Sequence, residues 1–289
     1  MNKKQSALLR IILYSVALIV LVGGTLVVFL YSSLHFSGSE SVTTQDGSTE
    51  LSTSTFSAEE FDSIEINWAN GMIAISPNEL LTDTITIKEV ASSEQTKKMQ
   101  LNRSGHTLQI EFCKSPVSIF GLTSFKDAAK DLYIEVPLDW FCKELNVNAA
   151  SVTVNMSHME FRDAEFDLAS GDLNMDGCKM QCLNVDTASG TLNFNGELEE
   201  LECDAASANC NIQVSNHPNK IEFNSVSGDL ELTLPESCGF SVEQDGLSVS
   251  FASDFSTTTR DGRYVYGDGS CKIEADSVSG DISIHKLLP

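Results

Sequence analysis

Residues 166–175 read FDLASGDLNM and residues 185–194 read VDTASGTLNF, so a Ser-Gly step returns after nineteen residues in similar surroundings. The serine of this step recurs along the chain in AAS, ASAN and two copies of VSGD, and in the VSGD copies glycine follows it again. The repeated serines are Ser151, Ser170, Ser189, Ser207, Ser227 and Ser279. A fixed period of about this length is typical of proteins built from stacked repeats.

Apolar side chains keep a constant distance from each serine and alternate with polar ones, as in half-buried strands. Four residues before the serines stand Val147, Phe166, Val185, Cys203, Phe223 and Ala275. Three residues after them stand Val154, Leu173, Leu192, Cys210, Leu230 and Ile282. The Ser-Gly step marks a bend between two strand segments, because glycine adopts backbone angles that other residues resist.

One such coil cannot bury its own apolar face, whereas stacked coils share a continuous core. The sequence therefore predicts an all-β protein, a single-stranded β-solenoid with coils of about nineteen residues. A β-sandwich also suits short, evenly spaced strands. It is disfavoured because the same residues recur at every repeat and because Asn-Gly and Asp-Gly hairpin turns are sparse.

The segment before the repeat has the same strand pattern and is predicted to supply the first coils. Its apolar positions are Ile64, Ile66, Met72, Ile73, Ile75, Ile85, Ile87, Leu108, Ile110 and Phe112. Residues 115–130 break the pattern and are predicted to form an excursion. A second excursion is expected between Ser227 and Ser279, although residues 240–263 still alternate and are kept within the domain.

The N-terminal segment predicts a membrane anchor. Residues 11–31 carry no charge and are long enough, as a helix, to cross the hydrocarbon core of a bilayer. A cleavable signal peptide is the alternative, but its apolar region is usually shorter. Lys3, Lys4 and Arg10 precede this run, which places the N-terminus in the cytoplasm. The predicted divisions are a cytoplasmic tail (1–10), a transmembrane helix (11–34), a flexible Ser/Thr-rich stalk (35–57) and an extracytoplasmic β-solenoid (58–289).

The predicted ectodomain is strongly acidic. The whole chain has a formal net charge of −23, and three of its basic residues precede Glu40, so the remainder carries −26. Nucleic-acid binding requires basic side chains that neutralise phosphates, so it is excluded as a function. The charge leaves cationic ligands open, and it also serves solubility.

Three stretches resemble the DUF4097 family of bacterial putative adhesins, which is related to head domains of the DUF2807 type. They are FDSIEINWANGMIAISPN at residues 61–78, LYIEVPLDWFCKELNVNAAS at 132–151 and YVYGDGSCKIEADSVSGDISIHK at 264–286. The resemblance covers about residues 56–289. It implies a membrane-tethered solenoid at a bacterial surface and supplies no catalytic residues. Thr191 and Ala208 depart from the Ser-Gly-Asp pattern, which argues against a ligand ladder shared by every coil.

Eight cysteines in an oxidising compartment would favour disulfides. Cys203 and Cys210 occupy inward positions and are interpreted as buried apolar residues. Cys178 and Cys182 are predicted to lie in a connection between coils, where they are the better candidates for a disulfide. Zinc is disfavoured because four ligands do not converge.

Asp167, Asp186 and Asp204 form a column three residues before the serine, continued by Asn224. Turn capping and solvation explain such residues. Bridging by Ca²⁺ is the alternative, because stacked carboxylates repel one another unless they are solvated or share a cation.

No motif for catalysis, for a cofactor or for a resident metal is present, and the five histidines are scattered. The sequence therefore predicts a non-enzymatic surface module, membrane-anchored in a bacterium, that contacts a protein or glycan of the cell envelope. A sensory or regulatory ectodomain of an envelope-stress system is the second hypothesis. A glycan-active enzyme is the third, because some β-helices cleave polysaccharides.

Overall fold

The computed structural model describes residues 42–43, 49–80, 82–91, 98–112 and 129–288. Apart from one 3-10 turn, η1 (Ala58–Glu60), the regular structure there is all β, which confirms the predicted class. The strands are β1 (Val42–Thr43), β2 (Thr49–Ser57), β3 (Ser63–Pro77), β4 (Thr84–Ala91), β5 (Gln100–Ser104), β6 (Thr107–Glu111), β7 (Lys130–Val136), β8 (Phe141–Ser157), β9 (Glu160–Val214), β10 (Lys220–Ser227), β11 (Leu230–Leu234), β12 (Phe240–Ser253), β13 (Thr258–Arg260), β14 (Arg263–Tyr266) and β15 (Cys271–Lys286).

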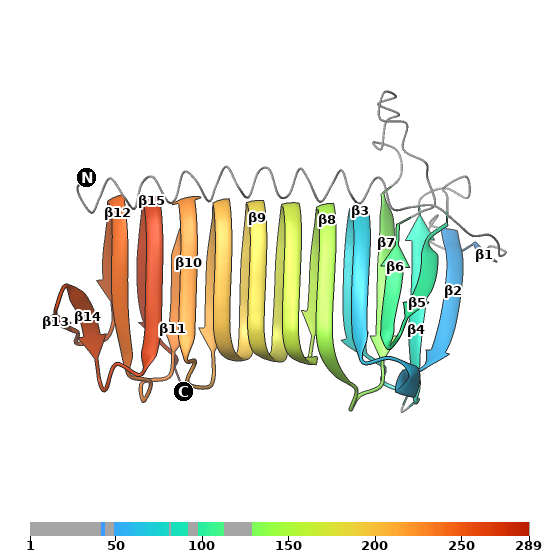
Figure 1. The fold of residues 1–289 in the computed structure, drawn as a ribbon, viewed down its shortest axis with the longest axis horizontal. Helices are drawn as coiled ribbons and strands as arrows, with labels where there is room; N and C mark the ends of the chain where they lie inside the picture. Colours follow the sequence, from blue (N-terminus) through green and yellow to red (C-terminus); the bar gives the residue numbers. More distant parts are fainter. Residues whose placement is uncertain (1–41, 44–48, 81, 92–97, 113–128, 289) are drawn as a thin grey trace, which may run out of the picture.

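Successive coils stack in parallel, and the serines of the repeat align. Ser151 pairs with Ser170, and Ser227 lies between Ser207 and Ser279. Figure 1 shows the coils side by side along the long axis, with β2 toward one end and β12 toward the other. The chain therefore winds as a β-solenoid, in the register that the sequence repeat predicts.

The core is a column of apolar side chains that each coil extends. Phe166, Leu173 and Leu192 are almost completely buried, and their places in the coils are the inward positions of the repeat. Burying a side chain of this size contributes roughly 1.5 to 3 kcal/mol. Because every coil adds several, the stack is stabilised by its length.

The glycine of the bend lies directly against the coil before it. Gly190 has a φ of 145°, and a Cβ at this position would lie 1.7 Å from the carbonyl oxygen of Gly171. Only glycine can take this place without moving the backbone. The aspartate after the glycine also joins coils, because Asp229 Oδ1 accepts the backbone N–H of Asp281 at 2.8 Å.

The C-terminal coils do not follow chain order. The last strand, β15, pairs with β10 and β11 on one side and with β12 on the other, although β12 precedes it in the sequence. The long stretch of sequence between Ser227 and Ser279 therefore contains one more coil. In this coil Ser248 takes the place of the repeated serine and pairs with Ser279. Of the second predicted excursion, β12 is a coil and β13 with β14 forms an antiparallel hairpin over its start.

The N-terminal coils show the same exchange. β3 pairs with β8 on one side and with β6 and β7 on the other, so the first coil lies inside the second. Here Asn70 and Gly71 replace Ser-Gly, with Asn70 paired to Ser151. Most of the predicted excursion at 115–130 lies outside the described residues, and its last residue, Lys130, belongs to β7.

A buried ion pair lies near the N-terminal end of the stack of coils. Lys130 Nζ contacts Glu89 Oε1 and the carbonyl oxygen of Phe112, with both charged side chains fully buried. Trp68 Nε1 donates to the carbonyl oxygen of Lys130 at 2.9 Å. Removing one partner would leave an uncompensated buried charge, which makes such a pair costly to break.

The predicted stalk is wrong for its last residues. Residues 49–57 form β2, which pairs antiparallel with β4. Leu51 is buried in this strand, and β-branched threonines around it suit an extended backbone. The predicted tail (1–10) and transmembrane helix (11–34) lie outside the described residues. Within the part that the structure describes, no helix is long and apolar enough to cross a membrane.

Candidate functional site

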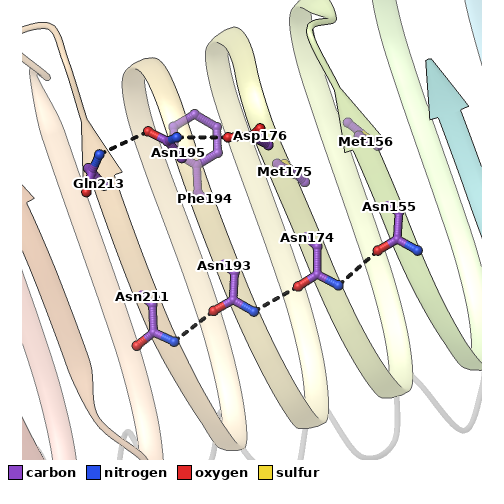
Figure 2. A pocket seen from close by; sticks show the side chains of 10 residues that line it. All are labelled: Asn155, Met156, Asn174, Met175, Asp176, Asn193, Phe194, Asn195, Asn211 and Gln213. Atoms are coloured by element: carbon purple, nitrogen blue, oxygen red, sulfur yellow. Dashed lines mark hydrogen bonds between the residues drawn. The ribbon is translucent and has the colours of Figure 1, made fainter.

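A groove of about 480 Å³ runs across the coils on the segment that follows the bend. It crosses β8 and successive turns of β9, so neighbouring coils contribute equivalent residues (Figure 2). Its lining residues are Asn155, Met156, Asn174, Met175, Asp176, Asn193, Phe194, Asn195, Asn211 and Gln213. The groove is therefore a product of the repeat rather than of one loop.

One wall of the groove is a row of four asparagines, the first amide row. Asn174 donates to Asn155 Oδ1 at 3.0 Å, Asn193 to Asn174 Oδ1 at 2.8 Å and Asn211 to Asn193 Oδ1 at 2.8 Å. All four stand four residues after a serine of the repeat. The row follows from the parallel register, which places equivalent side chains one strand spacing, about 4.8 Å, apart.

A second amide row lies two residues further along each strand, on the same outward face. Asn195 Nδ2 donates to Asp176 Oδ1 at 2.8 Å, and Gln213 Nε2 donates to Asn195 Oδ1 at 3.2 Å. These three side chains are exposed. Figure 2 shows both rows running in the same direction across neighbouring coils.

The rows present donors and acceptors at the same time. Each amide nitrogen carries two hydrogens and each amide oxygen two lone pairs, and a link in the row uses one of each. The unused groups face the groove at regular intervals. Phe194 and Met175 are buried, so no aromatic ring stands out as a platform among the described lining residues, and the exposed side chains of the groove are amides and Asp176.

The predicted aspartate column lies on the segment before the bend and is half-buried. Burial, followed by the neighbouring charges of Asp167 and Asp204, raises the pKa of Asp186 to about 7. Burial also raises the pKa of Asp167 and of Asp204. Asn224 Nδ2 donates to Asp204 Oδ1 at 2.8 Å. At this end of the column, the hydrogen bond partly offsets the rise in the pKa of Asp204.

In the described part of the chain, the aspartate column does not form a cluster of metal ligands. Within the described ranges, no group of three or more His, Cys, Asp or Glu side chains is arranged to hold a metal ion. The groove contains one carboxylate, Asp176, among its described lining residues. Hydrolysis of a glycosidic bond ordinarily uses two carboxyl groups that flank the bond.

The structure places four of the cysteines in β9. Cys178 is buried in β9, with its thiol 3.7 Å from the carbonyl oxygen of Asp176, and Cys182 is half-buried in the same strand. Both lie where β9 leads from one coil to the next, shortly after Gly177 (φ 64°), and the backbone of this connection is extended. Cys203 and Cys210 are buried as predicted, and their sulfur atoms lie 3.3 Å apart.

The sequence pattern did not predict the amide rows. The available signal was the asparagine at the fourth position after the serine, in four consecutive repeats. It was obscured because these residues are polar members of alternating strands, where any hydrophilic side chain satisfies the pattern. Only the register shows that the four amides contact one another.

The fold and the groove define an all-β domain of stacked parallel coils with a polar outer surface. The chain belongs to the family described as Toastrack DUF4097, which it matches over residues 61–285. No curated protein matches it.

Among solved structures, the chain resembles one described as a putative adhesin from Bacteroides fragilis NCTC 9343, with 15% identity and a TM-score of 0.44. That match covers 81% of this chain and 96% of the other. A structure described as a putative lipid binding protein from Parabacteroides distasonis ATCC 8503 has 15% identity and a TM-score of 0.41, covering 82% and 96%. A putative cell adhesion protein from Clostridium sporogenes ATCC 15579 has 14% identity and a TM-score of 0.31, covering 82% and 98%. Likeness at this level decides nothing about function.

Proposed function

We propose that this protein is a membrane-anchored, non-enzymatic module outside the cytoplasm that binds a neutral, hydroxyl-rich glycan along the groove. The observation that carries the proposal is the pair of amide rows. Sugar hydroxyls donate and accept hydrogen bonds, as amides do, so a row of amides complements a row of hydroxyls. The repeat of the coils gives the groove the regular spacing that a linear polymer requires.

The charge of the domain supports a neutral partner. The chain carries a net charge of −23, which repels anionic polymers. Within the groove, Asp176 is the charged residue among the described lining side chains. Neutral amides thus occupy the place where binding would occur, and the acidic residues of the column stand on the other side of the bend.

The surface also argues against a large protein interface at the groove. Binding energy at such interfaces concentrates in exposed aromatic and arginine side chains. The exposed large apolar residues of the described chain are Leu80, Leu138, Phe141 and Leu288, and none of them lines the groove. A glycan, held by many equivalent hydrogen bonds, suits these walls better.

The location follows from the N-terminal sequence. An uncharged run at residues 11–31 preceded by three basic residues supports a single span with the domain outside the cytoplasm. There the groove would meet envelope polysaccharides.

The test is binding of the full chain to neutral and to anionic polysaccharides, measured by affinity electrophoresis. We expect retardation by a neutral glycan that falls at least tenfold in a variant carrying Asn195→Ala and Gln213→Ala. Asn184→Ala is the matched control, because Asn184 is exposed on the same strand but does not line the groove. Binding that survives the double substitution would show that the groove is not the binding site. Release of reducing ends from the glycan would refute the non-enzymatic assignment.

A further inference from the structure

Two pairs of buried thiols meet inside the described coils. Cys203 Sγ lies 3.3 Å from Cys210 Sγ, and both residues are fully buried. Cys238 and Cys271 are fully buried too and lie close enough for each thiol to shift the pKa of the other. Four of the seven described cysteines thus occur in neighbouring pairs, a pattern that isolated apolar replacements would not produce.

Both cysteines of the first pair occupy positions that are apolar in the next coil. In the next coil, Phe223 aligns with Cys203 and Leu230 aligns with Cys210. The two positions lie on opposite sides of the bend. A bond between the sulfurs would therefore tie the two segments of one coil together, where other coils rely on packing.

The second pair stands at the base of the exchanged C-terminal coil. Cys238 lies just before β12, and Cys271 is the first residue of β15. The backbone N–H of Cys271 donates to the carbonyl oxygen of Gly239 at 2.9 Å. A bond here would close a loop that holds β12, β13 and β14, the part of the chain that leaves the sequential order.

We propose that Cys203 with Cys210, and Cys238 with Cys271, form two intramolecular disulfides in the native protein. The inference rests on the extracytoplasmic location proposed above, because disulfides persist in oxidising compartments. In each pair two S–H bonds break and one S–S bond forms. The two electrons and two protons pass to the disulfide of a thiol–disulfide oxidoreductase, which becomes a dithiol.

The bond must form before the coil closes. The thiolate is the reactive species, and the Cys210 contact together with burial raises the pKa of Cys203 well above its ordinary value. Oxidation during folding avoids this barrier. Once made, the bond is shielded from reductants by the same core.

The test counts alkylated thiols in the full chain, extracted without reductant and denatured in an alkylating reagent. Cys203→Val frees Cys210 and should raise the count by one, and Cys271→Val should do the same through Cys238. Cys142→Val is the matched control, a buried cysteine whose thiol contacts the carbonyl oxygen of Glu144, and it should lower the count by one. A fall by one in the Cys203 or Cys271 variant overturns the proposal for that pair.

Peptide mapping identifies the partners. Cleavage before Asp204 separates Cys203 from Cys210, and cleavage after Arg260 separates Cys238 from Cys271. We expect both linked pairs, and a peptide that links any of these four cysteines to a different cysteine would contradict the assignment.

A second arm refolds reduced protein with oxidised glutathione, which tests the pairing without relying on location. No linked peptides after refolding would overturn the pairing. Linked peptides after refolding with none in the extracted protein would overturn the disulfides in the native compartment, together with the proposed location. Neither result bears on glycan binding, which is measured on side chains outside the core.

Discussion

The amide rows and the aspartate column are built by the same repeat but behave in opposite ways. In the first amide row, Asn193 donates to one neighbour and accepts from the other at 2.8 Å. In the column, Asp186 stands between Asp167 and Asp204, and its pKa is raised to about 7. In a parallel stack each residue lies next to equivalent residues of the neighbouring coils. Side chains that both donate and accept hydrogen bonds therefore stabilise the stack, and like charges destabilise it.

The largest expected effect comes from moving a carboxylate into the amide row. Asn193→Asp removes the donor to Asn174 Oδ1 and sets a negative charge against that oxygen. We expect a loss of about 2 kcal/mol in the free energy of unfolding above pH 6, because a half-buried acceptor is left unpaired. Urea unfolding at pH 7.5 measures it. Asn184→Asp, on an exposed position of the same strand, is the control, and an equal loss there would show that the row contributes nothing.

The reverse exchange should stabilise the protein. The pKa of Asp186 is about 7 in the folded state, whereas an unfolded aspartate has a pKa of about 3.9. Between these values the folded state binds more protons, so its contribution to stability falls as pH rises from about 4 to about 7. Asp186→Asn removes this loss and should raise stability by about 1 kcal/mol at pH 8, after allowance for solvent screening.

The comparison of wild-type and Asp186→Asn melting temperatures across pH 4 to 8 checks this expectation. The two curves should converge toward pH 4 and separate toward pH 8. Asp172→Asn provides a control outside the column. Parallel curves for wild type and Asp186→Asn would show that the column does not repel.

The smallest effect is the response to salt. Screening weakens repulsion between partly exposed carboxylates, and the Debye length falls from about 10 Å at 0.1 M to about 3 Å at 1 M. Raising NaCl should therefore stabilise the wild type by a few tenths of a kcal/mol and Asp186→Asn by less. Thermal unfolding at several NaCl concentrations measures it. A larger gain in the variant would contradict repulsion within the column.

Much of the fold was predictable because the repeat is local. The serine positions predicted the register, and the alternation of apolar residues predicted which side chains face the core. The amide rows were also within reach, since Asn155, Asn174 and Asn193 stand at equivalent positions. The pattern did not show that these side chains contact one another. Contact between coils depends on stacking, and the sequence shows only periodicity.

The ends of the stack were beyond such reasoning. A repeat predicts that neighbouring coils in the sequence are neighbours in space, yet β15 lies between β10 and β12, and β3 lies between β7 and β8. The exchange places the first and last coils inside the stack, where strands hydrogen-bond on both sides. The chain order carries no signal for it, because each coil is compatible with either neighbour.

The sequence by itself determined the all-β class, the coil length and the bend, since alternation and Ser-Gly spacing follow from backbone geometry. The tertiary structure alone decided which coils meet, that Lys130 and Glu89 pair in the interior, and that Cys203 faces Cys210. These contacts join positions whose separation in the chain follows no period, or whose side chains look apolar in the pattern. Their partners are chosen by packing in three dimensions, which a one-dimensional repeat does not encode.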